Sequence, residues 1–289
     1  MDIFIVNSVA GNGKSIKYLK ALEEIYDSSL YDYKTIYARD REDTINKALY
    51  YSTLHSVRYI FSIGGDGTLN SIVNGMIGNK PLVVIPAGTG NDFFKGTNKL
   101  TNDTLVDVGI VNDEYFLGIL SIGLDALACN KANLMKQKNF NKNAYIKGTL
   151  EALREYESLS LKMNYNDTKK SKRVLLSSFC NNTCLGNGIN ISPNSSLVDG
   201  KLDLILINDM NKLRILYTFI KILLGKHMED KNISFEKVEK AYLEFLKPVL
   251  YAFDGEERYA SELDVEVSPR KILIKKELDP RIINLCNEK

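Results

Sequence analysis

The chain of 289 residues has little cysteine, little histidine and almost no net charge. Its four cysteines and two histidines have no metal-ligand spacing, which argues against a zinc site. So few cysteines in a chain of this length fit a reduced, cytoplasmic protein. The 38 basic residues nearly balance the 36 acidic ones, whereas proteins that coat nucleic acid usually have a basic excess. We therefore expect no nucleic-acid partner.

Long apolar runs are also absent. No stretch approaches the roughly 20 apolar residues that a membrane-spanning helix needs. The first six residues lack the basic start and the cleavage site of a signal peptide. We expect a cytoplasmic protein that reaches lipid from the membrane surface.

The pattern of expected strands and helices changes near residue 128. Over the first 125 residues apolar strands alternate with amphipathic helices, which is typical of a doubly wound, largely parallel sheet. Beyond that point strands dominate, which favours an antiparallel sandwich or barrel. This predicts an α/β protein with domains at residues 1–128 and 129–275, and a tail at residues 276–289 that packs back on the first domain. Strands are expected at residues 3–6, 34–37, 58–63, 82–85, 159–165, 174–179, 201–207, 241–246, 249–253, 263–267 and 271–274, and helices at residues 16–26, 44–54, 69–76, 144–156 and 213–224.

Three glycine-bearing loops follow three of the expected strands, at residues 7–14, 64–68 and 86–92. In open parallel sheets ligands bind outside the carboxyl ends of the strands. Glycine allows the backbone to approach a phosphate closely, and backbone N–H groups there attract an anion. One such loop is more often a tight turn, but three at corresponding positions favour a phosphate site.

Two familiar phosphate-binding signatures match only in part. The Gly-Lys-Ser at residues 13–15 ends like a Walker A loop, but Ser8 stands where that loop requires its first glycine. The Gly-Thr-Gly at residues 88–90 begins like the dinucleotide fingerprint, but no third glycine follows. These mismatches exclude an ordinary P-loop kinase and an ordinary Rossmann dehydrogenase.

Acidic side chains stand within or beside this glycine-rich region, at Asp66, Asp92 and Asp107. Carboxylates repel phosphates unless a cation lies between them, and Mg²⁺ often bridges carboxylates to substrate phosphates. The pattern therefore indicates a magnesium–nucleotide site. The alternative is that these acids cap the N-termini of helices, and spacing alone does not decide between the two.

Six short motifs occur in order at residues 64–70, 86–93, 106–109, 121–126, 199–203 and 254–256. Together they resemble the diacylglycerol kinase catalytic-domain family, which is related to NAD kinase and 6-phosphofructokinase through the Gly-Gly-Asp-Gly motif. The resemblance spans nearly the whole chain. It implies a nucleotide-binding α/β domain, then an antiparallel β-sandwich domain, with the active site in the cleft between them.

The resemblance also implies a catalytic apparatus. Asp254 would be the general base for the acceptor hydroxyl, supported by Glu256. Without the resemblance, an Asp-Gly pair between two apolar runs would predict only a hairpin turn. Asp66, Asp92 and Asp107 would form the carboxylate network of a catalytic Mg²⁺.

Further residues are assigned to ligands by the same resemblance. Asp199 would hold a second, structural Mg²⁺ together with the backbone carbonyls of Ser196 and Lys201. The phosphate donor would be ATP. It would be bound by Asn7, Gly11, Gly13, Lys14, Thr35, Gly64, Gly65, Gly67, Thr68, Gly88, Thr89, Gly90 and Asn91.

The expected function is that of an ATP- and Mg²⁺-dependent lipid kinase, with diacylglycerol as the acceptor and phosphatidic acid as the product. An NAD kinase-like enzyme and a non-catalytic lipid- or nucleotide-binding protein are the alternatives. The motifs at residues 88–92 and 254–256 favour the lipid kinase over NAD kinase. The aspartates at positions 66, 92, 107 and 254 are all present, which argues against a protein that keeps the fold but has lost catalytic activity. The sequence departs from the family pattern at Ser8 and Phe94, of which the second would reshape the mouth of the pocket. A homodimer is also expected from the resemblance.

The helix expected within residues 211–226 is apolar over more than the usual core-facing stripe. Burial between the sandwich and a neighbouring element is the favoured interpretation. Contact with a membrane surface is the alternative, because Lys212, Lys221 and Lys226 would lie near anionic headgroups.

Overall fold

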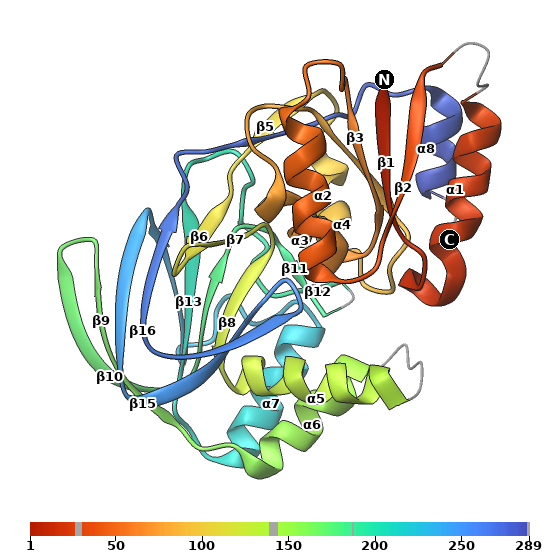
Figure 1. The fold of residues 1–289 in the computed structure, drawn as a ribbon. Coiled ribbons are helices and arrows are strands. Elements are labelled where there is room, and N and C mark those ends of the chain that lie inside the picture. The colour runs from red at the N-terminus through yellow and green to blue at the C-terminus, as the bar shows by residue number, and fades with distance from the viewer. Residues whose placement is uncertain (27–30, 139–143, 187, 288–289) are drawn as a thin grey trace. The chain divides into compact units, whose positions relative to one another are not determined.

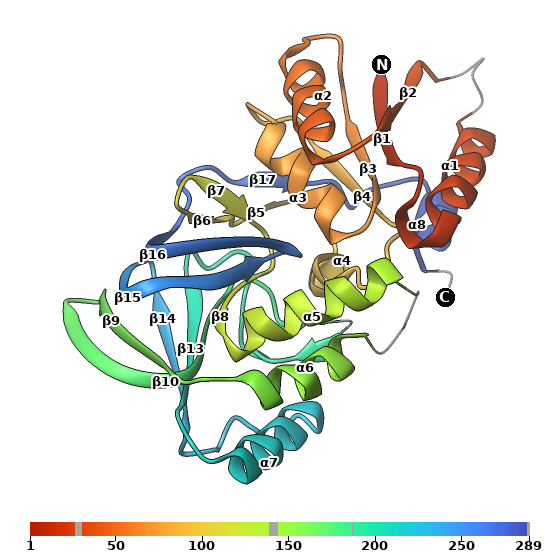
Figure 2. The ribbon, with the colours of Figure 1, turned by 60° about the horizontal axis from the view of Figure 1, so that its bottom comes forward.

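The structure is a computed structural model that describes residues 1–26, 31–138, 144–186 and 188–287. The chain divides into two compact units. Unit 1 comprises Met1–Val106 and Arg270–Lys289, and unit 2 comprises Asp107–Pro269. Figures 1 and 2 show the elements of each unit.

Unit 1 contains a six-stranded sheet in the order β2-β1-β3-β4-β17-β5. Neighbouring strands run parallel from β2 to β17, and β5 is antiparallel to β17 at one edge. The central strands are apolar on both faces, as expected for a parallel sheet covered on both sides. The strands are β1 (Asp2–Asn7), β2 (Tyr33–Ala38), β3 (Ile60–Gly64), β4 (Leu82–Pro86), β5 (Thr104–Val106) and β17 (Ile272–Ile274).

Helices cover both faces of this sheet (Figure 1). Leu19 of α1 and Leu285 of α8 pack with Phe4 and Phe61 in one core cluster, which places α1 and α8 on one face. Figure 1 shows α2 and α3 on the opposite face. The helices are α1 (Lys14–Ile25), α2 (Arg41–Thr53), α3 (Asp66–Gly75), α4 (Asp92–Gly96) and α8 (Pro280–Asn287), with short 3₁₀ turns η1 (Ala10–Gly13) and η2 (Thr97–Lys99).

Unit 2 is built on a nine-stranded antiparallel sheet in the order β14-β13-β10-β8-β15-β16-β6-β7, with β9 paired to both β10 and β15. The sheet folds back on itself because β10, β8, β15 and β9 pair in a closed ring. Its strands are β6 (Gly109–Val111), β7 (Glu114–Phe116), β8 (Ile119–Gly123), β9 (Leu159–Tyr165), β10 (Thr168–Cys180), β13 (Leu202–Asn208), β14 (Ile233–Val238), β15 (Lys240–Phe253) and β16 (Glu256–Val267), and a separate ribbon joins β11 (Cys184–Leu185) to β12 (Ile189–Asn190).

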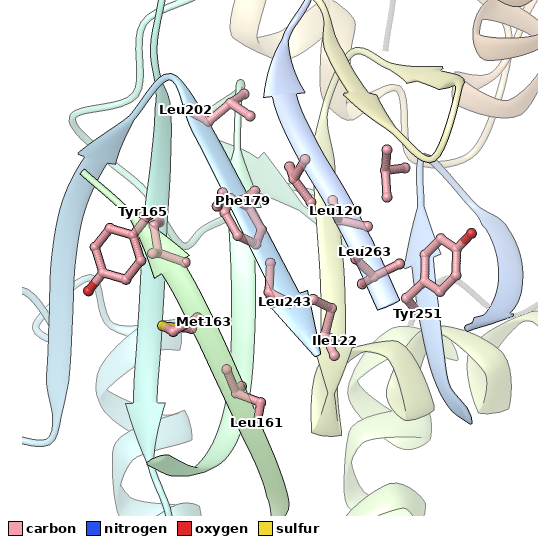
Figure 3. Close-up of a cluster of buried hydrophobic side chains, with 14 of the residues drawn as sticks. Leu120, Ile122, Leu161, Met163, Tyr165, Phe179, Leu202, Leu243, Tyr251 and Leu263 are labelled. Carbon is pink, nitrogen blue, oxygen red and sulfur yellow. The ribbon is translucent and has the colours of Figure 1, made fainter. Parts of the chain in front are cut away.

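Two apolar clusters stabilise unit 2. The first lies within the folded sheet, where Leu120, Phe179, Leu243 and Leu263 come from four different strands and are buried together (Figure 3). The second lies between the sheet and three helices, α5 (Leu124–Lys138), α6 (Ala144–Glu155) and α7 (Lys212–Leu223), which Figure 2 shows grouped together.

The first domain boundary lies earlier than the sequence predicted, at residue 106 rather than 128. Strands β6 and β8 pair with β16, β10 and β15, so residues 109–123 belong to the second sheet. These strands are short, and their partners lie more than 50 residues away, so local periodicity did not reveal the pairing.

The second boundary also differs from the prediction. The strand expected at residues 271–274 as part of the sandwich is β17, which pairs with β4 and β5 in the sheet of unit 1. The strands expected at residues 241–246 and 249–253 are a single strand, β15, with an irregular register between Glu244 and Val249. Among the described residues, no helix is long and apolar enough to cross a membrane.

Candidate functional site

The three glycine loops begin where β1, β3 and β4 end, at Asn7, Gly64 and Pro86. These strands are parallel, in the order β1-β3-β4, so their carboxyl ends share one edge of the sheet. This is the edge at which open α/β sheets bind ligands.

The loops at this edge touch one another. Asn7 Nδ2 donates to Thr68 Oγ1 over 3.2 Å, which joins the first loop to the second. A Cβ atom placed on Gly11 would lie 2.0 Å from the carbonyl oxygen of Ala87, and one placed on Gly88 would lie 2.4 Å from Cα of Gly65. Such distances leave no room for a side chain, so at these positions the glycines allow backbone to pack on backbone.

The third loop is held by the side chain of Asn91. Its Oδ1 accepts the Gly88 N–H over 2.9 Å, and its Nδ2 donates to the carbonyls of Pro86 and Gly88, each over 3.0 Å. Asn91 itself has φ 52°, a left-handed conformation that asparagine tolerates better than most residues. The loop is therefore braced from within before α4 begins.

Two of the predicted acids meet at this loop. Oδ2 of Asp66 and Oδ2 of Asp92 lie 3.1 and 3.4 Å from the point where a Cβ on Gly90 would stand. The carboxylate of Asp66 also accepts the N–H groups of Asp92 and Phe93, each over 3.1 Å. Asp66 thus caps the start of α4, as the capping interpretation predicts, and its carboxylate stands beside that of Asp92.

Asp66 and Asp92 fit a divalent cation in donor type, because Mg²⁺ prefers oxygen ligands and commonly uses one or two carboxylates. Asp107, the third predicted member, belongs to unit 2. Among the described residues, no group of three or more His, Cys, Asp or Glu side chains is arranged to hold a metal ion. The three-carboxylate network therefore stays a prediction.

Two other residues that the resemblance assigns to ATP, Lys14 and Thr35, contact side chains of unit 1. The ammonium group of Lys14, at the start of α1, lies 5.0 Å from the centre of the Tyr18 ring. Thr35 lies in the middle of β2, opposite Phe4, and its hydroxyl donates to Glu23 of α1 over 3.0 Å. Thr35 is thus not brought to the carboxyl edge of the sheet, because its place in the strand register fixes it away from the loops.

In unit 2, Asp254 occupies the turn between β15 and β16. Both turn residues have positive φ, 48° for Asp254 and 92° for Gly255, as a two-residue type I′ hairpin requires. The half-buried carboxylate of Asp254 accepts the N–H groups of Leu117 and Gly118, over 2.6 and 2.8 Å. This residue therefore forms the turn and also fixes a carboxylate against a second segment of the chain.

Asn181, which no sequence pattern singles out, links Asp107 to the segment that holds Asp254. Its fully buried side chain donates from Nδ2 to the carbonyls of Asp107 and Leu117, each over 2.9 Å. The carbonyl of Gly118 in turn accepts the backbone N–H of Asn181 over 2.9 Å. Asn181 follows β10 and stands in no recognisable motif, so only the folded chain reveals it.

Asp107 is buried and anchored to the loop before β13. Its Oδ2 accepts the Gly200 N–H over 2.7 Å, and its own N–H donates to the Leu197 carbonyl over 2.6 Å.

Glu256 follows the hairpin turn that contains Asp254. It lies 3.5 Å from Arg258, which also pairs with Glu114 over 2.9 Å. Glu256 is thus part of an ion-pair group that joins β16 to β7.

The predicted structural metal site surrounds Asp199. Its Oδ1 accepts the Lys201 N–H over 3.2 Å, and its other oxygen pairs with the ammonium of Lys237, which raises the pKa of that lysine. Lys237 also lies 3.8 Å from Asp203. A cation therefore already stands beside Asp199 in this arrangement, which does not fit a divalent metal ion unless Lys237 moves.

Asp125 stands in one of the six motifs but had no assigned role. Its carboxyl group is buried in the first turn of α5 and accepts the hydroxyl groups of Ser121 and Tyr145. Burial raises the pKa of Asp125, and the two hydroxyl groups oppose that rise. The group ties β8, α5 and α6 together.

Phe94, which departs from the family pattern, lines a cavity of about 350 Å³ in unit 1. The cavity lies between α4, β17 and α8, and Lys276 stands 5.5 Å from the Phe94 ring. Loss of solvation lowers the pKa of Lys276. The large side chain therefore shapes a cavity behind α4.

Comparison with protein families matches both halves of the chain. Residues 3–112 match the diacylglycerol kinase catalytic domain, and residues 118–275 match the YegS C-terminal NAD kinase β-sandwich-like domain. The second match covers more than half of the chain. Both confirm the family resemblance and the predicted fold class of an α/β domain followed by a β-sandwich-like domain.

Curated relatives support the same family. A diacylglycerol kinase of Bacillus subtilis (strain 168) is 26% identical over 269 residues, covering 87% of this chain and 88% of its own. A diacylglycerol kinase of Mycobacterium tuberculosis is 27% identical over 225 residues, covering 71% and 72%.

Two solved Bacillus anthracis structures titled as diacylglycerol kinases share the fold. Their TM-scores are 0.77 and 0.70 at 22% and 20% identity, and they cover 95% of this chain and 95% and 96% of their own. The chain therefore belongs to the diacylglycerol kinase catalytic-domain family of enzymes, with the YegS C-terminal β-sandwich-like domain as its second half.

Proposed function

We propose that the protein is a lipid kinase that transfers the γ-phosphate of ATP to the hydroxyl group of diacylglycerol and forms phosphatidic acid. The observation that carries this proposal is the carboxylate of Asp254, held by two backbone N–H groups at a hairpin turn in a chain of this family. These hydrogen bonds orient the carboxylate from a second segment of the chain, and we assign to it the acceptance of the hydroxyl proton.

The donor is bound by unit 1. The glycine loops pack together at the carboxyl edge of the sheet, the edge at which glycine-rich loops and helix N-termini suit the phosphates of ATP. Asp66 and Asp92 would hold the Mg²⁺ at this edge of the sheet. When bound, Mg²⁺ neutralises the charge that develops on the phosphoryl group.

The acceptor is activated by unit 2. Asp254 takes the proton of the lipid hydroxyl while the hydroxyl oxygen attacks the γ-phosphorus, and the bond from the γ-phosphorus to the β-phosphate oxygen breaks to release ADP. The hydrogen bonds from Leu117 and Gly118 fix the direction of the carboxylate.

The decisive experiment is transfer of γ-labelled phosphate from ATP to mixed micelles of diacylglycerol with Mg²⁺, beside an identical reaction with NAD. We expect label in phosphatidic acid and none in NADP. Label in NADP alone would replace the proposal by an NAD kinase. Binding of ATP with no transfer to any of a wide panel of lipids would support a binding protein instead.

A further inference from the structure

Helix α7 of unit 2 exposes an apolar face. Leu213 is 83% exposed and Leu224, which follows the last turn, is 64% exposed. The sequence favours burial of this face, but the structure contradicts this prediction, because the helix buries only the stripe of Ile215, Thr218 and Ile222. The further exposed apolar residues are Leu216, Tyr217, Ile220 and Leu223.

The opposite face anchors the helix firmly. Ile215 and Ile222 are buried in the second core cluster of unit 2, and Thr218 is 1% exposed. The side chain of Asn211 caps the helix by accepting the Arg214 N–H over 2.9 Å. The helix that carries the exposed leucines is therefore held in place. Leaving these side chains in water costs free energy, and a partner that covers them would remove this cost.

Positive charge surrounds this face. Residues 212–226 contain four basic residues and no acidic one. Arg214 and Lys221 pair with the buried carboxylate of Asp230, over 3.2 and 3.1 Å. Among the described residues no acid pairs with Lys212 or Lys226, so an unneutralised ammonium group stands at each end of the helix.

Tyr217 lies in the middle of the exposed face. Its ring is flanked by Arg214 and Lys221, which lie 5.1 and 5.0 Å from its centre. A half-exposed tyrosine with a polar tip suits the boundary between apolar chains and water. A helix with leucines on one side and lysines at its margins is typical of segments that lie flat in the headgroup region.

We propose that the exposed face of α7 seats the protein on the surface of an anionic lipid bilayer. The occupant is lipid because the leucines need an apolar phase while Lys212 and Lys226 need anionic partners, and a bilayer of acidic lipids offers both. This inference rests on the proposed lipid kinase function, since docking brings the enzyme to an acceptor that lies in the membrane.

The test is co-sedimentation of the full-length protein with vesicles that contain neither diacylglycerol nor ATP. We expect the protein to bind vesicles that contain 30% phosphatidylglycerol. Its affinity for pure phosphatidylcholine vesicles should be lower by about an order of magnitude, the difference that the basic residues of α7 provide. Leu213→Gln/Leu224→Gln should reduce binding by at least about tenfold without changing net charge. Lys212→Gln/Lys226→Gln should reduce it about fivefold per lysine and flatten its salt dependence.

The matched control is Leu246→Gln, because Leu246 is 87% exposed but lies in β15. It should bind vesicles like the unchanged protein. Equal losses in Leu246→Gln and in the α7 variant would overturn the assignment to α7. A dimer in solution that dissociates in Leu213→Gln/Leu224→Gln would overturn it too, by showing that a second copy covers the face.

A separate assay distinguishes this inference from the proposed function. Phosphorylation of a short-chain, water-soluble diacylglycerol requires no docking, so the α7 variants should retain it at the normal rate. If the protein phosphorylates that substrate but never binds the anionic vesicles, the lipid kinase stands and the docking surface is refuted. If it binds the vesicles but phosphorylates no diacylglycerol, the docking surface stands alone.

Discussion

Two of the hairpin turns of unit 2 that carry an aspartate differ in what that aspartate contacts, although their backbone geometry is nearly the same. Asn112 and Asp113 join β6 to β7 with φ of 44° and 71°, and Asp254 and Gly255 join β15 to β16 with φ of 48° and 92°. Asp113 is exposed, whereas the half-buried carboxylate of Asp254 accepts two N–H groups from another segment. Turns of similar backbone geometry therefore leave one aspartate exposed and orient the other against a second segment of the chain.

The largest effect is expected when each of the two aspartates is replaced by asparagine in a separate variant. Asp254→Asn should lower kcat for diacylglycerol phosphorylation by about 10²–10⁴-fold, because the amide cannot accept the hydroxyl proton. Asp113→Asn, the matched control, should leave kcat unchanged. Initial rates with purified variants of equal thermal stability would decide the matter, and near-normal turnover in Asp254→Asn would refute the base assignment.

A second test moves the carboxylate without removing it. A Cβ atom on Gly118 would lie 2.6 Å from Oδ1 of Asp254, so Gly118→Ala must push the carboxylate aside. We expect kcat to fall by about 10²-fold, the typical cost of misplacing a catalytic group by about 1 Å. Gly255→Ala is the control, because a Cβ there meets no atom within 4 Å. Its cost should be strain in the turn, measured as lower stability with kcat largely kept.

A third test concerns the link between Asp107 and the Asp254 hairpin. Asn181→Ser removes the amide that donates to both Asp107 and Leu117, so the segment that holds Asp254 loses a support. We expect kcat to fall about tenfold while the KM for ATP stays the same, and the unfolding free energy to fall by about 1–3 kcal/mol. Equal losses in kcat and in affinity for ATP would instead indicate general damage to the fold.

The smallest effect on catalysis is expected at Asp230, a carboxylate with a purely structural setting. Burial acts to raise its pKa, but hydrogen bonds from Asn232 and Lys221 and the charge of Arg214 outweigh it and hold the pKa of Asp230 at about 2. The ion pairs therefore stabilise the fold above pH 4, and their contribution is lost as the pH falls through 2.

Chemical denaturation at several pH values would measure this contribution. From the lowered pKa of Asp230 we expect it to approach about 2 kcal/mol at neutral pH. Asp230→Asn should remove that part of the pH dependence and leave kcat for a short-chain diacylglycerol within about twofold of normal. An unchanged pH profile in the variant would show that Asp230 contributes nothing to stability.

The fold class and the positions of most main elements could be predicted from the sequence alone. Buried strands such as residues 3–6 and 82–85 lie in β1 and β4 because apolar runs between glycine turns encode them locally. The carboxyl-edge position of the glycine loops follows from the same alternation of strand and helix. Family motifs then assigned roles that local patterns alone left open, such as that of Asp254.

Features that depend on residues far apart in the chain could not be predicted from local sequence patterns. The assignment of residues 109–123 to unit 2 and of β17 to unit 1 follows from strand pairing across more than 50 residues. The hydrogen bonds that orient Asp254, the link through Asn181 and the exposed face of α7 arise in the same way. Local periodicity records which residues are apolar, but only packing determines which of them are covered and which polar groups meet.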